Sequence, residues 1–83
     1  MVWKLYVLKS AKTGRFYIGH TNCLERRLAE HNGGQTRSTR SGVPWRLVHQ
    51  ESFTEKPAAA ARERQIKAWK SHRSIEELIA SSG

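Results

Sequence analysis

Three things are scarce in this chain: cysteine, long apolar segments and acidic residues. Its one cysteine, Cys23, cannot form an internal disulfide, which predicts a protein of a reducing compartment, the cytoplasm. No apolar run approaches the roughly 20 residues that a membrane-spanning helix needs, so we expect no membrane association. No signal peptide is evident either, because the first residues read directly into a strand.

The scarcity of acidic residues leaves the chain strongly basic. It has 15 Lys and Arg against 7 Asp and Glu, a formal net charge of +8 at pH 7. Such a surplus on a small protein favours a polyanionic partner, most often nucleic acid. The alternative is a basic protein with no polyanionic partner. At 83 residues we expect one domain, spanning residues 1–83, with a small core.

The first residues predict a β-hairpin. Val2–Ser10 carries apolar residues at both parities, as an interior strand does. A turn over residues 11–14, with a glycine suited to positive φ, leads into a second strand at Arg15–His20. A turn centred on residues 11 and 12 would place Tyr6 opposite Tyr17 on one face of the hairpin.

The rest of the chain predicts three helices and one more strand. Asn22 is a candidate N-cap for the first helix, and Gly33-Gly34 is a stop signal. A polar connection of about a dozen residues then follows, a length typical of functional or mobile loops. The resulting order β-β-α-β-α-α predicts an α+β domain with helices packed on a small sheet. In chain order the expected segments are the helix Asn22–Asn32, the strand Trp45–Phe53, the helix Thr54–Lys70 and a short helix opening at a Ser74–Glu77 capping box.

Several polar side chains fall where buried faces are expected. Arg27 and His31, four residues apart, flank the apolar stripe of the first helix, and Glu63 lies on that of the second. Taken singly, each has an ordinary explanation, such as a glutamate paired with a lysine on its own helix or a histidine near the negative end of a helix dipole. With Tyr6 and Tyr17, however, these groups all project toward the same sheet.

Together, these five groups suit the cleavage of a phosphodiester. An inward-facing carboxylate can hold one divalent cation, and an arginine fork can grip phosphate oxygens. A tyrosine or histidine within hydrogen-bond reach of water can remove its proton during attack.

The same residues carry a resemblance to the GIY-YIG nuclease domain, especially to its small standalone members. Tyr6 is followed eleven residues later by Tyr17-Ile18-Gly19, and then by Glu25–Asn32 (Glu-Arg-Arg-Leu-Ala-Glu-His-Asn) and Ala60–Lys67 (Ala-Ala-Arg-Glu-Arg-Gln-Ile-Lys). The similarity runs from about Trp3 to Ile79. It implies a three-stranded antiparallel sheet flanked by helices and the metal-dependent hydrolysis of DNA, as in relatives that serve repair, restriction, intron homing and branched-DNA resolution.

The resemblance also implies roles for individual residues. Tyr6 matches the usual candidate for the general base, and Tyr17 matches a base or phosphate-positioning group. Arg27 matches the catalytic arginine of the first helix, and His31 matches the polar residue one turn later. Glu63 matches the glutamate that binds one metal ion, Mg²⁺ or Mn²⁺.

The chain departs from the family pattern at two places. Lys4-Leu5-Tyr6 stands where the first motif has Gly-Ile-Tyr, and the only asparagines are Asn22 and Asn32, so the late asparagine of many members is absent. These departures keep open a second interpretation, a non-catalytic DNA- or RNA-binding module on the same scaffold.

The remaining basic residues predict a phosphate-binding surface, the alternative being an ordinary solvated charged surface. Nothing resembles a base-reading helix module, so we expect recognition of DNA by shape or ends (branched, nicked or single-stranded) and no small-molecule cofactor. The candidate contacts are Arg37, Arg40, Arg62, Arg64, Lys67 and Lys70.

Overall fold

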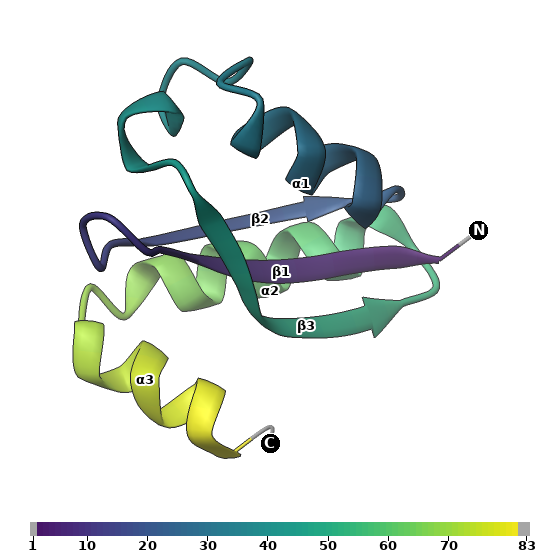
Figure 1. The fold of residues 1–83 in the computed structure, drawn as a ribbon. Coiled ribbons are helices and arrows are strands. Elements are labelled where there is room, and N and C mark those ends of the chain that lie inside the picture. Colours follow the sequence, from purple (N-terminus) through teal and green to yellow (C-terminus); the bar gives the residue numbers. More distant parts are fainter. Residues whose placement is uncertain (1, 82–83) are drawn as a thin grey trace.

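The computed structural model of the chain describes residues 2–81. The elements are β1 (Trp3–Ser10), β2 (Phe16–Thr21), α1 (Leu24–Asn32), a 3-10 turn η1 (Arg40–Gly42), β3 (Trp45–Phe53), α2 (Lys56–Ala68) and α3 (His72–Ser81). The strands form one antiparallel sheet in the order β2-β1-β3 (Figure 1).

The α+β class, the three-stranded antiparallel sheet and the element order are those predicted from the sequence. The ends of the predicted 1–83 domain, residues 1, 82 and 83, lie outside the described residues. Among the helices of residues 2–81, none has the length and apolar character needed to cross a membrane.

The sheet separates two apolar clusters. Its central strand β1 contributes to both, because alternate side chains point to opposite faces, and this confirms the interior strand predicted from its apolar residues at both parities. On one face the sheet packs against α2 and α3 through Leu5, Val7, Ile18, Ile66 and Ile75. On the other face it packs against α1 through Tyr6, Leu8 and Trp45, with Leu24 and Leu28 of the helix alongside.

The hairpin places its tyrosines on the predicted face but in a different register. Leu8 pairs with Tyr17, and Tyr6 pairs with Gly19, so the predicted Tyr6–Tyr17 opposition is wrong by two residues. The cause is Ser10, whose Oγ accepts hydrogen bonds from two backbone amides of the turn and so moves the turn along the chain. A shift of two residues preserves the alternation of side chains, and the two tyrosine rings therefore remain neighbours, 6.3 Å apart.

The first two helices begin one or two residues later than predicted. Helix α1 begins at Leu24, so Cys23 rather than Asn22 occupies the N-cap, and no side-chain hydrogen bond caps the helix. Helix α2 has Glu55 rather than Thr54 at its N-cap. In both segments several polar residues precede the first turn, and the sequence alone does not rank them.

The junction between α2 and α3 also differs from the prediction. Helix α2 ends at Ala68 instead of Lys70, because Lys70 takes a left-handed φ of 49° that cannot continue a helix. Helix α3 begins at His72 rather than at the predicted cap, Ser74. The amide of Ser74 donates to Ser71 Oγ at 3.3 Å, so Ser71 does the capping.

The α1–β3 loop, residues 33–44, is fastened at several points. The Ser10 hydroxyl donates to the Gly42 carbonyl at 2.6 Å, and the Trp45 indole donates to the Thr39 carbonyl at 2.7 Å. Asn32 exchanges two hydrogen bonds with the backbone of Trp45, at 2.6 and 3.0 Å. The loop is therefore held by the hairpin, by α1 and by the first residue of β3.

Gly19 leaves the space that the Tyr6 ring fills. A Cβ at Gly19 would lie 2.6 Å from the Tyr6 hydroxyl oxygen and 2.8 Å from Cζ. Any side chain at this position must therefore displace the tyrosine.

We expect Gly19→Ala to destabilise the protein by about 1–3 kcal/mol, as an added methyl in a filled space does. In a Tyr6→Phe background the same change should cost less, because the atom nearest the new methyl is gone. Urea unfolding of the four proteins measures both costs, and equal costs in the two backgrounds would contradict the contact.

Candidate active site

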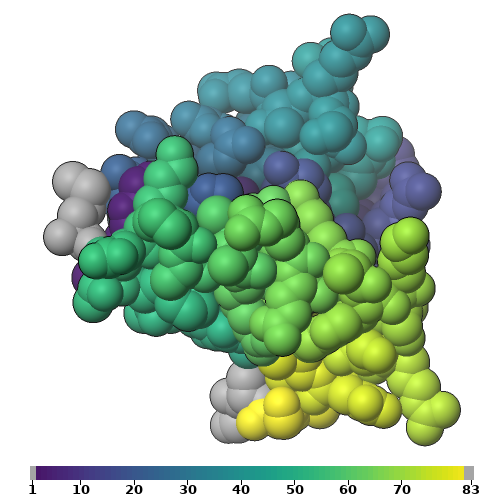
Figure 2. Space-filling model, turned by 180° about the vertical axis from the view of Figure 1, so that it is seen from behind, coloured from purple at the N-terminus to yellow at the C-terminus, as the bar shows by residue number. Residues whose placement is uncertain are grey.

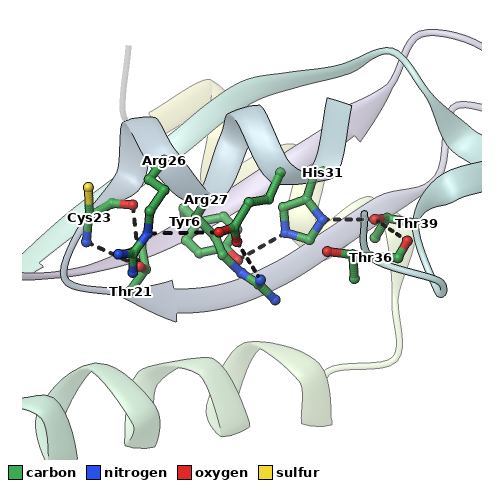
Figure 3. Close-up of polar contacts among 9 residues, drawn as sticks. Tyr6, Thr21, Cys23, Arg26, Arg27, His31, Thr36 and Thr39 are labelled. Atoms are coloured by element: carbon green, nitrogen blue, oxygen red, sulfur yellow. Dashed lines mark hydrogen bonds and ion pairs between the residues drawn. The ribbon is translucent and has the colours of Figure 1, made fainter. Parts of the chain in front are cut away.

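Tyr6 lies at the centre of the candidate site (Figure 3). It is carried by the central strand, is 1% exposed, and its hydroxyl lies 3.3 Å from His31 Nε2. Burial raises the pKa of Tyr6 above its ordinary value; a hydrogen bond from Arg27 opposes the rise, and the nearby Tyr17 and Glu63 add to it. The phenol is therefore protonated at neutral pH.

His31 is fully buried, and its two ring nitrogens have different partners. Nε2 faces the Tyr6 hydroxyl, while Nδ1 lies 2.8 Å from Thr39 Oγ1. The Tyr17 ring packs against the imidazole with its centroid 4.7 Å away. Burial lowers the pKa of His31, and the charge of Arg27 lowers it further, so the imidazole is neutral at pH 7.

Arg27 connects this buried pair to the solvent. Hydrogen bonds first to Tyr6 and then to Glu30 raise the pKa of Arg27 above its ordinary value, and its Nη1 lies 3.0 Å from Glu30 Oε1. The side chain is 34% exposed, so part of the guanidinium remains open to a ligand. Arg26, one residue earlier, is 68% exposed, and its Nε lies 3.8 Å from Glu30 Oε2. The helical spacing thus directs two adjacent arginines to different environments.

Glu63 approaches from α2, on the opposite face of the sheet. One carboxylate oxygen lies 2.7 Å from His20 Nδ1, and the other accepts a hydrogen bond from Lys67 Nζ at 2.7 Å. Burial alone would raise the pKa of Glu63, but the hydrogen bonds from Lys67 and His20 lower it below its ordinary value, so the group is a carboxylate. Its negative charge contributes to the raised pKa of Tyr6, which lies on the other face of the sheet.

Glu63 is the carboxylate of the site that could ligate a divalent ion, and in this structure its two oxygens are engaged by His20 and Lys67. The described residues hold no group of three His, Cys, Asp or Glu that could form a metal cage. Mg²⁺ commonly binds one or two carboxylates and keeps several waters, so a single ionised carboxylate meets its need. The imidazole of His20 lies beside the carboxylate. In this structure the half-exposed ammonium of Lys67 provides the positive charge that pairs with Glu63.

Two hollows adjoin the site, and Tyr17 lines both. One, of about 420 Å³, lies between β2, α2 and α3 and has Arg15, Lys67 and Lys70 among its lining residues. The other, of about 260 Å³, lies between the hairpin and the α1–β3 loop, with Thr39 in its wall. Seen from behind, the hairpin (blue to purple) is visible between that loop (teal) and α2 (green) (Figure 2).

The predicted phosphate contacts are dispersed over the surface. Lys67 and Lys70 border the larger hollow, whereas Arg37 and Arg64 are exposed away from the hollows' walls. Arg40 donates to the Gly34 carbonyl at 3.0 Å.

Arg62 is already engaged within the protein. It forms a two-pronged pair with Glu51 of β3, with its Nε at 2.9 and 3.2 Å from the two carboxylate oxygens. Its guanidinium also lies 5.7 Å from the centroid of the Trp69 ring, which packs against the core. Among the six predicted contacts, the two lysines are those that line a hollow together with Tyr17.

Sequence reasoning missed two participants in the site. His20 shares a face of β2 with Phe16 and Ile18, so strand alternation combined with the packing of α2 on that face would have placed it beside Glu63. Thr39 gave no signal, because it lies in an irregular polar loop without periodicity.

The neutral state of His31 predicts a dependence of stability on pH. Its pKa is lowered in the folded protein, so between that pKa and the ordinary value of 6.5 the unfolded chain binds more protons than the folded one. The stability linked to His31 is thus complete above about pH 6.5 and is lost as the pH falls below it. We expect His31→Gln to flatten this part of the curve, as measured by urea unfolding over a pH series. An unchanged slope would mean that His31 is not held neutral.

The chain is similar to known proteins of one family. A family model described as the GIY-YIG catalytic domain matches residues 2–76. A UPF0213 protein of Natronomonas pharaonis is 43% identical over 77 residues, which cover 92% of this chain and 88% of the relative. A UPF0213 protein of Halobacterium salinarum is 42% identical over 64 residues, covering 76% of this chain and 82% of the relative.

A solved structure shows the same fold. The solution NMR structure of a UPF0213 protein from Bacillus halodurans superimposes with a TM-score of 0.63 at 33% identity, covering 100% of this chain and 87% of that one. Because the family model matches most of the length of this chain, the chain belongs to the GIY-YIG family. The catalytic domain of this family places the chain in a superfamily of nucleases.

Proposed function

We propose that the protein is a divalent-metal-dependent endonuclease that hydrolyses DNA phosphodiester bonds. The observation that supports this most is one cluster: a buried tyrosine hydroxyl, a neutral imidazole whose Nε2 lies 3.3 Å away and a partly exposed arginine side chain beside the tyrosine. An ionised carboxylate, Glu63, lies near enough for its charge to act on the same tyrosine.

The proton path starts from Tyr6. Its phenol is neutral at rest, so it must lose its own proton as it takes one from the attacking water. In this proposal His31 Nε2, which lies 3.3 Å from the hydroxyl, accepts that proton. As the water oxygen bonds to phosphorus, the bond from phosphorus to the leaving sugar oxygen breaks, and the leaving oxygen takes a proton from solvent. Arg27, beside Tyr6, stabilises both the transient phenolate and the charge on the phosphate.

Glu63 is the residue that would hold the metal ion, with His20 beside it. When bound, Mg²⁺ or Mn²⁺ neutralises charge on the phosphate oxygens. Lys67 pairs with Glu63 in the structure and is half exposed, so its long side chain is free to swing into solvent and release the carboxylate. Tyr17 lines both hollows, and in this proposal it would orient the phosphate.

The substrate in this proposal is DNA recognised by its shape or ends, with branched, nicked and single-stranded forms as the candidates. Lys67, Lys70 and Arg15 at the larger hollow offer positive charge beside the site without a helix that could read bases. The proposal places the enzyme in the cytoplasm, acting in DNA repair or recombination without a small-molecule cofactor. We further propose that residues 1–83 form a single nuclease domain.

Two adjacent arginines provide a matched test. We expect Arg27→Ala to lower Mg²⁺- or Mn²⁺-dependent nicking by roughly 100-fold or more, as loss of one preorganised charge-stabilising donor does. Glu63→Gln should abolish metal-dependent nicking. Arg26→Ala should leave the nicking rate within about twofold of that of the native protein, since exposed ion pairs are worth little. The assay is a cleavage panel of plain, nicked, flapped, branched and single-stranded DNA. Equal nicking by the Arg26 and Arg27 variants would mean that the site is assigned wrongly.

A non-catalytic nucleic-acid-binding module is the second candidate. It is favoured by the ion pair that Lys67 forms with the predicted metal ligand Glu63 and by the absence of the first-motif glycine and the late asparagine. It predicts salt-dependent binding of DNA or RNA without cleavage in any divalent metal ion.

Binding at the larger hollow has its own test. We expect Lys70→Ala to reduce the slope of log affinity against log salt by about 0.7–0.9, the value for one lost phosphate contact. The matched control is Lys56→Ala, because Lys56 lies at the other end of α2, over the Trp3 ring. Titrations at several salt concentrations measure both, and equal slopes for the two variants would exclude Lys70 from the interface.

A further inference from the structure

We propose that Thr39 is a positioning residue that fixes the proton of His31 on Nδ1 and thereby keeps Nε2 free to accept the proton of Tyr6. This inference rests on the function proposed above. It adds a residue of the α1–β3 loop that touches neither the phosphate nor the metal ion and that acts through His31.

The direction of the hydrogen bonds follows from counting protons at Thr39. Its Oγ1 lies 2.8 Å from His31 Nδ1 and 3.3 Å from the Thr36 carbonyl oxygen (Figure 3). A hydroxyl has one proton, and a carbonyl can only accept. The Thr36 carbonyl, which also accepts from the Thr39 amide at 3.1 Å, takes the hydroxyl proton in this proposal, and toward His31 the hydroxyl oxygen is then the acceptor. His31 must then supply the proton, from Nδ1.

A neutral imidazole carries one N–H, so a proton on Nδ1 leaves Nε2 as an acceptor. Nε2 faces the Tyr6 hydroxyl at 3.3 Å, so Tyr6 donates to it. The chain of hydrogen bonds runs in one direction, from Tyr6 through His31 and Thr39 to Thr36. In the opposite tautomer Nε2 would itself be a donor, and the Tyr6 proton would have no acceptor.

Thr39 is held in place before any ligand binds. It is 1% exposed, and its carbonyl oxygen accepts hydrogen bonds from the Trp45 indole at 2.7 Å and from the Gly42 amide at 3.1 Å. Trp45 is tied in turn to the side chain of Asn32 at the end of α1. The loop therefore fixes the hydroxyl relative to the same helix that carries His31.

The charged groups around His31 are compatible with a neutral ring. Arg27 and Glu30 of α1 act on it with opposite signs, and burial is the larger effect. From the strands it meets the aromatic rings of Tyr6 and Tyr17, and from the loop the hydroxyl of Thr39. The tautomer is thus left to the hydrogen bonds, and Thr39 supplies the one at Nδ1.

Thr39→Val and Thr39→Ser form a matched pair for the test. Valine keeps the shape but removes the acceptor, whereas serine keeps the hydroxyl. The first measurement is the ¹⁵N NMR shifts of the His31 ring, which report the tautomer directly. We expect the Nδ1–H form in the native protein and in Thr39→Ser, and a shift toward the Nε2–H form in Thr39→Val.

The second measurement is the cleavage kinetics of the same proteins. We expect Thr39→Val to lower kcat by about 10–100-fold with KM nearly unchanged, as the loss of a group that orients another does. Thr39→Ser should retain most of the activity.

The outcomes separate this inference from the function on which it rests. An Nε2–H tautomer in the native protein overturns the inference even if cleavage is efficient, and so does a kcat for Thr39→Val equal to that of the native protein. Absence of cleavage by the native protein overturns the proposed function and the catalytic role of Thr39 with it, while the NMR comparison still decides the tautomer. If Thr39→Val does not fold, the native and serine spectra carry the decision.

Discussion

The buried contact between the Tyr6 hydroxyl and His31 Nε2 is the constraint that the rest of the structure satisfies. The tyrosine ring needs the empty space above Gly19, which the register of the hairpin brings opposite Tyr6. The imidazole must come from the last turn of α1, and its far side needs the Thr39 hydroxyl. Two strands, a helix and a loop are thus placed around one hydrogen bond.

The electrostatics of this pair bear on how a proton moves through it. Burial raises the pKa of Tyr6 and lowers that of His31, so both shifts oppose transfer of the proton at rest. In the proposed reaction, transfer becomes favourable as Tyr6 gains the proton of the attacking water, because the phenol is then never left as a lasting anion. Arg27, bonded to the tyrosine, lowers the cost of whatever charge develops. The arrangement therefore favours a concerted step in which Tyr6 releases one proton while receiving another.

The spacing of apolar residues along the chain predicted the central strand and the two sides of the first helix. The apolar residues at both parities of β1 identified the central strand, and the 3.6-residue period of α1 separated Arg27 from Arg26. The register of the hairpin escaped prediction because it is set by one side chain, Ser10, that hydrogen-bonds the turn. Thr39 escaped because its position comes from tertiary hydrogen bonds in a loop without a repeating pattern.

The sequence also left open how residues on two faces of a sheet can serve one phosphate. Tyr6 and Arg27 lie on the α1 face, and Glu63 lies on the α2 face. β2 is an edge strand, so a ligand at this edge can reach both faces without crossing the sheet. The positive charge of Arg15, Lys67 and Lys70 beside β2 discourages pairing with another chain, as charged groups at sheet edges do. In the proposed function the same charge would attract phosphate, and the edge that needs protection would also be the place where residues of the two faces act together.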